Sequence, residues 1–244
     1  MPSLLSSRLR VLANNTVLVK KVISVGAGCG YPLNVKEPLE EKNMFNGLPQ
    51  EESRAYSMSK KMMFIANEAY FKQYKINSSS IIPSNIYGEF DNFNLEKSHV
   101  IPALVRKFYE AKLKNKKSVD VWGDGKAKRD FIHAEDVANA LLFLFNYDII
   151  SMTADKTGAK CQKFNIVGKD EIDNLELAKF IAKVQNKELK YEMVDFHSQR
   201  PGHDLRYALD GSKMEKMGWV PKSAYEQLET TINWTLENDR WLSI

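Results

Sequence analysis

A tyrosine and a lysine four residues apart could form an acid–base pair. Tyr56 and Lys60 bound the segment Tyr56-Ser-Met-Ser-Lys60, and on a helix this spacing puts both side chains on one face. A free phenol has a pKa near ~10, and a neighbouring ammonium lowers that pKa by favouring the phenolate. Such a tyrosine can exchange a proton with a carbonyl oxygen. The same spacing also recurs by chance on surface helices, so both interpretations stand at this point.

Alternating strands and helices must position this pair. Short apolar segments, typical of buried strands, are separated by segments with helical spacing. We expect strands at 22–25, 79–82, 119–122 and 164–167, and helices at 4–20, 53–74, 99–114, 134–146, 175–184 and 221–241. This alternation predicts an α/β fold with a mostly parallel sheet. In the helix that carries the pair, the expected core-facing stripe is Met58, Met62, Ile65, Ala66 and Ala69.

A glycine-rich bend follows the first expected strand. Its sequence is Gly26-Ala-Gly-Cys-Gly30, and it leads into Tyr31-Pro32 and a polar loop over 33–52. A dinucleotide-binding fingerprint needs a strand, a glycine turn and a helix in that order, so we expect no phosphate site here. Because nothing before Val22 supplies that order either, the chain is expected to begin after the coenzyme's phosphate-binding loop.

Composition narrows the classes of protein and partner. The net charge of +4 comes from scattered lysines, whereas a nucleic-acid site needs basic residues clustered on one face. The longest apolar stretch, 140–145, is far shorter than the ~20 residues of a bilayer span. Two cysteines form no disulfide framework, which favours a reducing cytoplasm. The four histidines lack metal-ligand spacing, so we predict no metal.

Further motifs follow the acid–base pair in a fixed order. They are Ile81-Ile-Pro83-Ser-Asn-Ile-Tyr87-Gly88, Ser98-His-Val-Ile-Pro102 and Val121-Trp-Gly-Asp-Gly-Lys-Ala-Lys-Arg129-Asp-Phe-Ile-His133. The set, nearly continuous from Val22 to about Tyr147, resembles the extended short-chain dehydrogenase/reductases, the NAD-dependent epimerase/dehydratase family, and within it the GDP-fucose synthase group.

This resemblance implies a partial Rossmann-like fold. We expect part of a doubly wound parallel sheet with a small C-terminal substrate-binding lobe, so that residues 1–244 form the C-terminal part of such a domain. The sheet segments would cover roughly 1–88 and 134–187, and the lobe segments roughly 89–133 and 188–244.

The resemblance also implies roles for single residues. Tyr56 and Lys60 match the catalytic pair, which also contacts the coenzyme, while Cys29 and His99 match the pair that exchanges protons beside the keto group. Pro83 and Ile86 match nicotinamide contacts, and the expected nucleotide-sugar contacts are Asn85, Lys107, Trp122 and Arg129. Simpler interpretations stay open: His99 as a helix cap, Cys29 as an inert buried thiol, Trp122 as a core residue, and Arg129 in a surface ion pair.

Two positions depart from the GDP-fucose synthase pattern. Ala27 stands where that group has a hydroxyl that polarises the keto group, and Ser24 lies too early on the strand to replace it. The segment from Arg200 to Asp210 instead resembles nucleotide-sugar dehydratases and decarboxylases. There the matches of Arg200 and Arg206 bind the diphosphate, a task suited to paired arginines; an ion-paired surface turn is the alternative.

The implied activity is that of a nucleotide-sugar epimerase/reductase. It would act on a nucleoside diphosphate 4-keto-sugar with NADP(H), or NAD, bound weakly because the phosphate-binding loop is missing. Another nucleotide-sugar epimerase or dehydratase is an alternative. A non-catalytic remnant that binds nucleotide sugar or dimerises is the alternative from a different class. Expected partners are the nucleoside diphosphate sugar and either a second copy or a full-length homologue, with no nucleic acid and no membrane.

Overall fold

A computed structural model describes residues 19, 21–122, 125–147, 161–186, 190–194 and 206–243, without the side chains of 122, 190–194, 206–207 and 243. Its strands are β1 (Val22–Val25), β2 (Ser78–Pro83), β3 (Asn85–Tyr87), β4 (Ser118–Trp122), β5 (Lys128–His133), β6 (Cys161–Ile166), β7 (Glu171–Asp173), β8 (Lys190–Val194) and β9 (Arg206–Tyr207). Its α-helices are α2 (Arg54–Tyr74), α3 (Val100–Leu113), α4 (Ala134–Asn146), α5 (Asn174–Val184), α7 (Ser212–Lys216) and α8 (Ala224–Glu237). Short 3-10 helices are η1 (Gly28–Gly30), η2 (Glu41–Asn43) and η3 (Asp239–Ser243). The expected strands and helices from 22 onwards are confirmed with shifted ends, whereas the helix expected over 4–20 lies outside the described residues.

A parallel three-stranded sheet in the order β1-β2-β6 confirms the expected α/β class. Val25 pairs with Ile81, and Pro83 pairs with Ile166. All three strands therefore end at the same edge, where α/β folds bind their ligands. Within the described residues β1 pairs only with β2, so the other side of β1 is an open edge.

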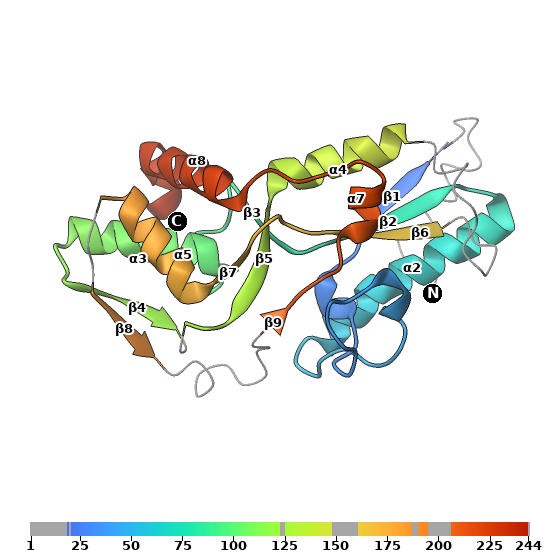
Figure 1. Ribbon diagram of the computed structural model, residues 1–244, viewed down its shortest axis with the longest axis horizontal. Coiled ribbons are helices and arrows are strands. Elements are labelled where there is room, and N and C mark those ends of the chain that lie inside the picture. The colour runs from blue at the N-terminus through green and yellow to red at the C-terminus, as the bar shows by residue number, and fades with distance from the viewer. Residues whose placement is uncertain are drawn as a thin grey trace.

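Helices cover both faces of this sheet (Figure 1). Strand alternation sends neighbouring residues to opposite faces: Ile81 packs with α4, Met214 and Trp219, while Ile82 packs with Phe64 of α2. Both isoleucines are fully buried. This alternation makes the three-layer arrangement that holds α2 and its Tyr56 against the sheet.

A second group of elements packs around α3, α5 and α8 at the other end of the molecule (Figure 1). There β5 pairs in parallel with β3 and antiparallel with β7, and β4 pairs in parallel with β8. The largest apolar cluster lies here and includes Phe108, Val121 and Leu228. Helix α5 packs in this cluster, whereas α7 packs on the sheet. These packing groups therefore do not follow the expected boundaries between sheet segments and lobe segments, and the division of the chain into these segments stays a prediction. Among the described helices, none combines the length and apolar character needed to cross a bilayer.

The buried face of α2 differs from the expected one. Met58, Met62 and Ile65 are 39%, 61% and 45% exposed, so the prediction that this stripe faces the core is wrong. The side chains that are buried belong to Ser57, Lys61 and Phe64. Helical periodicity predicts how the residues of one face are spaced, but not which face is buried. In α2 the buried face packs against the sheet and the loop after β1, where a serine and a lysine fit.

Candidate active site

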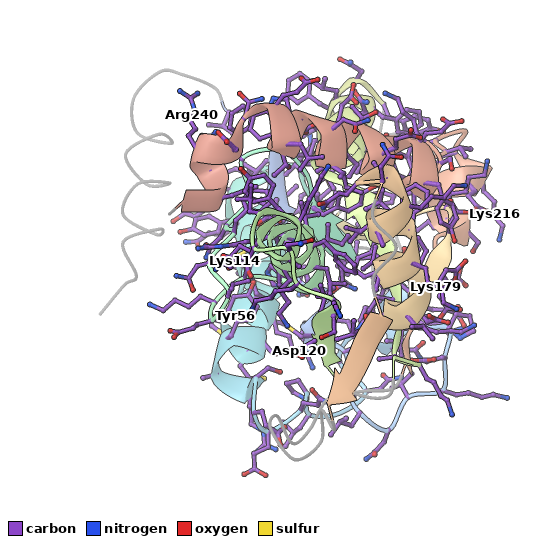
Figure 2. All side chains as sticks on the ribbon, turned by 90° about the vertical axis from the view of Figure 1, so that its left-hand side faces the viewer. Tyr56, Lys114, Asp120, Lys179, Lys216 and Arg240 are labelled. Atoms are coloured by element: carbon purple, nitrogen blue, oxygen red, sulfur yellow. The ribbon has the colours of Figure 1, made fainter. Side chains whose placement is uncertain are left out.

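Tyr56 and Lys60 lie in the first turns of α2, which begins after Ser53. The ammonium of Lys60 donates a 3.2 Å hydrogen bond to the carbonyl oxygen of Val25, the last residue of β1. The same ammonium lies 5.6 Å from the centre of the Tyr56 ring. Figure 2 shows Tyr56 on this helix, and 54% of its surface is exposed. The pair therefore stands at the carboxyl end of the sheet with the phenol open to solvent.

The pKa of Tyr56 lies above its usual value. Partial burial is the main cause, and the negative charge of an ionised Cys29 thiol adds to it. This direction contradicts the expectation that Lys60 lowers the pKa. The physical reason is that partial burial of the phenol dominates, while the ammonium donates its hydrogen bond to the Val25 carbonyl and not to the phenol oxygen. Tyr56 is thus a neutral acid at ordinary pH, and a charge on Cys29 reinforces this state.

Cys29 is a half-buried free thiol in the turn η1. The glycines of this turn are needed for packing: a Cβ on Gly26 would lie 2.6 Å from Cζ of Phe64, and one on Gly30 would lie 3.1 Å from Sδ of Met44. After the turn the chain continues in an extended conformation at Tyr31 rather than into a helix. The turn therefore does not open a helix, as the sequence predicts.

Ala27 precedes this turn and brings no hydroxyl to it. The hydroxyl of Ser24 lies 2.8 Å from that of Ser80, and both accept hydrogen bonds of 2.9 Å from the Asn67 amide. Ser24 is therefore committed to a polar cluster between α2 and the sheet. It does not replace the missing hydroxyl at Ala27.

The carboxyl end of β2 holds the residues expected at the nicotinamide and the sugar. Pro83 is buried, and Ile86 is 39% exposed. The Asn85 amide donates a 3.2 Å hydrogen bond to the backbone carbonyl of Asp130. Between them, the Ser84 hydroxyl is buried and has no hydrogen-bond partner among the described residues. Buried polar groups in native proteins are normally satisfied by protein or by ordered water, so this hydroxyl is available for a further hydrogen bond.

His99 occupies the N-cap position of α3, but its side chain makes no capping hydrogen bond. The ring is exposed, so the simpler interpretation as a helix cap is not supported. Whether His99 and Cys29 serve one substrate stays a prediction. Among the described residues, no group of three or more His, Cys, Asp or Glu side chains is placed to hold a metal ion.

Two of the expected nucleotide-sugar contacts, Lys107 and Trp122, belong to elements of the other packing group. Lys107 on α3 donates a 3.0 Å hydrogen bond to the backbone carbonyl of Asp120, which is labelled in Figure 2. Burial lowers the pKa of Lys107, although the Asp120 carboxylate opposes that shift. Trp122 ends β4 beside it, but its side chain lies outside the described residues.

The arginines expected at the diphosphate are described only in part. Arg129 on β5 donates a 2.7 Å hydrogen bond to the Lys128 carbonyl. Its neighbouring strand β9 places the backbone of Arg206 beside Lys128 and that of Tyr207 beside Arg129. The Arg206 side chain and the whole of Arg200 lie outside the described residues, so the convergence of the three arginines stays a prediction.

A buried polar group that sequence reasoning missed ties this region to the sheet. Asn165 of β6 is fully buried and accepts a 2.7 Å hydrogen bond from the Tyr31 hydroxyl. Its amide donates to the carbonyls of Leu39 and Asp210, at 2.8 and 3.0 Å. The signal in the sequence was an asparagine inside the apolar strand Phe164-Asn-Ile-Val. Through this side chain the loop after Cys29 and the segment after Arg206 are held together.

The chain matches the model of the family described as "NAD dependent epimerase/dehydratase family" over residues 6–150. It is 32% identical to the probable GDP-L-fucose synthase 1 of Oryza sativa, over 90% of this chain and 63% of that protein. It is equally 32% identical to the Escherichia coli GDP-L-fucose synthase, over 90% of this chain and 68% of that protein. The chain thus spans about two thirds of the length of these relatives.

A solved structure shares the fold. The GDP-mannoheptose C4 reductase from Campylobacter jejuni, with NADP bound, superposes with a TM-score of 0.75 at 27% identity, covering 95% of this chain and 74% of that one. The family match extends over more than half of the sequence and includes Tyr56 and Lys60. The chain therefore belongs to the NAD dependent epimerase/dehydratase family.

Proposed function

We propose that this chain forms the catalytic and substrate-binding part of a nucleotide-sugar epimerase/reductase similar to GDP-fucose synthase. Its substrate would be a nucleoside diphosphate 4-keto-sugar, and its coenzyme NADP(H). The observation that carries the proposal is the placement of Tyr56 and Lys60 at the carboxyl end of β1, the strand that the turn of Cys29 follows. The names of the relatives, GDP-L-fucose synthases from a plant and a bacterium, support this choice of chemistry.

Each of these side chains has a task that its environment suits. Tyr56 has a raised pKa, so it is protonated at neutral pH and can donate to the keto oxygen. Cys29 is half-buried beside it and, with the exposed His99, would exchange protons at the carbons next to the keto group. Ala27 leaves the keto oxygen without a second donor, and losing one such donor typically costs on the order of 10²–10³ in rate. Slow turnover is therefore part of the proposal.

Several described residues fit the nicotinamide end of the coenzyme. The carboxyl end of β2 offers the buried Pro83, the unpaired Ser84 hydroxyl and the exposed Ile86, while Lys60 stands at the end of β1. The bound coenzyme would supply the hydride. The described glycine-rich turn opens no helix for the pyrophosphate, so we expect a dissociation constant near millimolar, equivalent to ~4 kcal/mol.

A non-catalytic nucleotide-sugar-binding protein is the second candidate. Ala27, together with the commitment of Ser24 to Ser80 and Asn67, favours it, because the site then lacks a polarising hydroxyl. The dehydratase-like segment from Arg200 to Asp210 favours nucleotide-sugar binding under either candidate function. For the same reason, another nucleotide-sugar epimerase or dehydratase remains an alternative to the GDP-fucose synthase-like enzyme.

We also propose that the chain dimerises or pairs with a full-length homologue. The exposed stripe of Met58, Met62 and Ile65 on α2 and the open edge of β1 are surfaces that such a partner would cover. Sedimentation of the purified chain tests this: a monomer at all concentrations would contradict self-association. Neither cysteine forms a disulfide, which supports a reducing cytoplasmic location.

Within the chain we propose two lobes. One holds the sheet β1-β2-β6 with α2, α4 and α7, and the other holds α3, α5 and α8 with β4 and β8. Strand β5 links them, because its residues Phe131 and Ile132 pack in different clusters. The substrate would lie where β5 and β9 meet the end of β2.

Calorimetric titration with GDP-, UDP- and dTDP-sugars tests the proposed substrate class. Saturable binding of one of them is expected, with or without turnover in the presence of NADPH. Turnover that Tyr56→Phe abolishes would select the enzyme over the non-catalytic candidate. A folded chain that binds no nucleotide sugar would contradict both.

A further inference from the structure

Lys61, the neighbour of Lys60, is buried inside the protein. Only 3% of its surface is exposed, although lysine is almost never fully buried without a partner. Burial lowers the pKa of its ammonium. On a helix, consecutive residues point about 100° apart, so Lys61 faces away from the direction of Lys60. The buried position of this charge calls for a structural or functional reason.

The ammonium of Lys61 is held by the loop that connects η1 to α2. It donates a 3.0 Å hydrogen bond to the carbonyl oxygen of Gly47, and it lies 5.6 Å from the centre of the Phe45 ring. Phe45 in turn meets Phe64 of α2 edge-on, with ring centres 6.3 Å apart. The lysine therefore fastens the loop to the helix by a charged hydrogen bond and an aromatic contact.

The stem of Lys61 reaches the turn that carries Cys29. A Cβ on Gly30 would lie 3.9 Å from Cγ of Lys61 and 3.1 Å from Sδ of Met44, which belongs to the same loop. The Lys61 stem therefore lines the space beside Gly30 while its ammonium binds the loop at Gly47. The turn, the loop and the helix are the elements whose relative placement decides how far the thiol lies from Tyr56.

We propose that Lys61 is a positioning residue that clamps the turn of Cys29 and the loop at Gly47 against α2, the helix that carries Tyr56. The influence of Cys29 on the pKa of Tyr56 agrees with this placement. The role of Cys29 and Tyr56 in proton exchange rests on the proposed function. The positioning by Lys61 is tested without substrate.

The test compares Lys61→Met with Lys163→Met. The first change keeps most of the stem and removes the donor to Gly47. The second is the matched control, because the Lys163 ammonium lies 5.8 Å from the same Phe45 ring but is 3.9 Å from the Glu68 carboxylate. Both variants and the unchanged chain are alkylated with iodoacetamide. Peptide mass spectrometry then follows Cys29, with the buried Cys161 as the internal reference.

Lys61→Met should raise the alkylation rate of Cys29 at least about threefold, because local opening exposes a half-buried group. Hydrogen exchange of the loop around Gly47 should rise by roughly tenfold, as expected for the loss of a hydrogen bond from a charged donor. Lys163→Met should change neither by as much. Equal rates and equal exchange in the Lys61 variant and the unchanged chain would overturn the proposal.

A double-mutant cycle with Tyr56→Phe separates positioning from general loosening. In the unchanged chain, Tyr56→Phe should alter the pH profile of Cys29 alkylation, because the two groups interact. In the Lys61→Met background the same change should have little effect. An undiminished effect there would overturn the proposal even if the loop exchanges faster.

If Lys61→Met does not fold, Phe45→Leu carries the test, since Phe45 is 44% exposed and its replacement removes the ring beside the ammonium. It should raise the Cys29 rate in the same direction, and an unchanged rate would count against the clamp. These experiments use no substrate. A result that contradicts the positioning role of Lys61 can therefore be told apart from a nucleotide-sugar titration that contradicts the proposed function.

Discussion

Lys60 joins α2 to the end of β1: its ammonium lies 3.2 Å from the Val25 carbonyl oxygen. The ammonium thus points to the strand end, and the phenol of Tyr56 stays neutral because partial burial raises its pKa above the usual value. The hydrogen bond of Lys60 therefore holds α2 against the carboxyl end of the sheet. A neutral phenol is the form needed for donating a proton to a keto oxygen.

Ala27→Ser should raise turnover, because it returns a donor to the place where the family has a hydroxyl. Measured with NADPH and a nucleoside diphosphate 4-keto-sugar, on the chain alone and fused to the coenzyme half of a relative, the rate should increase on the order of 10²-fold or more. Tyr56→Phe should abolish it. The fusion should tighten NADPH binding without itself restoring a fast rate.

Rapid turnover and micromolar NADPH binding by the unmodified chain would contradict this account. So would an Ala27→Ser variant that is no faster while its fold and nucleotide-sugar affinity are intact.

Arg206→Ala should weaken nucleotide-sugar binding more than it changes stability. A charge-assisted hydrogen bond to the diphosphate contributes about 1.5–3 kcal/mol, which is at least a tenfold loss of affinity in a calorimetric titration. Lys179→Ala is the matched control, because Lys179 is an exposed cation on α5 (Figure 2). Equal affinities in the Arg206 variant and the control would rule out the diphosphate role.

Gly26→Ala should destabilise the fold, because its Cβ would lie 2.6 Å from Cζ of Phe64 and 3.2 Å from the Ile81 carbonyl oxygen. Overpacking of this kind costs about 1–3 kcal/mol in the free energy of unfolding, measured by urea denaturation. Gly30→Ala should cost less, since its nearest neighbour is the flexible Met44 side chain. If Gly26→Ala left stability intact but weakened NADPH binding, the turn would be a phosphate site after all.

Tyr31→Phe should lower the free energy of unfolding by about 1–3 kcal/mol at neutral pH, because the buried Asn165 oxygen loses its donor. The effect should depend on pH. Burial raises the pKa of Tyr31 in the folded state, so its contribution is fully present below the ordinary pKa near ~10 and is lost as the pH rises above it.

Denaturation at neutral and at strongly alkaline pH checks this pH dependence, and the variant should lose less stability than the parent chain. A parallel decline in both proteins would show that Tyr31 does not titrate as described.

The sequence by itself determined the local elements and the family. Helix α4 has the expected bounds and β1 the expected residues, because hydrophobic spacing and flanking glycine, proline or polar residues act within one segment. The order of motifs from Tyr56 to His133 is likewise a local property. It predicted the family that the comparisons confirm.

The tertiary structure decided which face of α2 is buried and what lies beside Tyr56. Met58 and Met62 gave the stronger apolar signal, yet Lys61 is buried, because the loop at Gly47 offers a carbonyl that an ammonium can satisfy. The short strands β3 and β7 depend on pairing with β5, which is distant from β3 in sequence. Such choices depend on the surfaces that meet when remote segments pack, and periodicity within one segment carries no information about them.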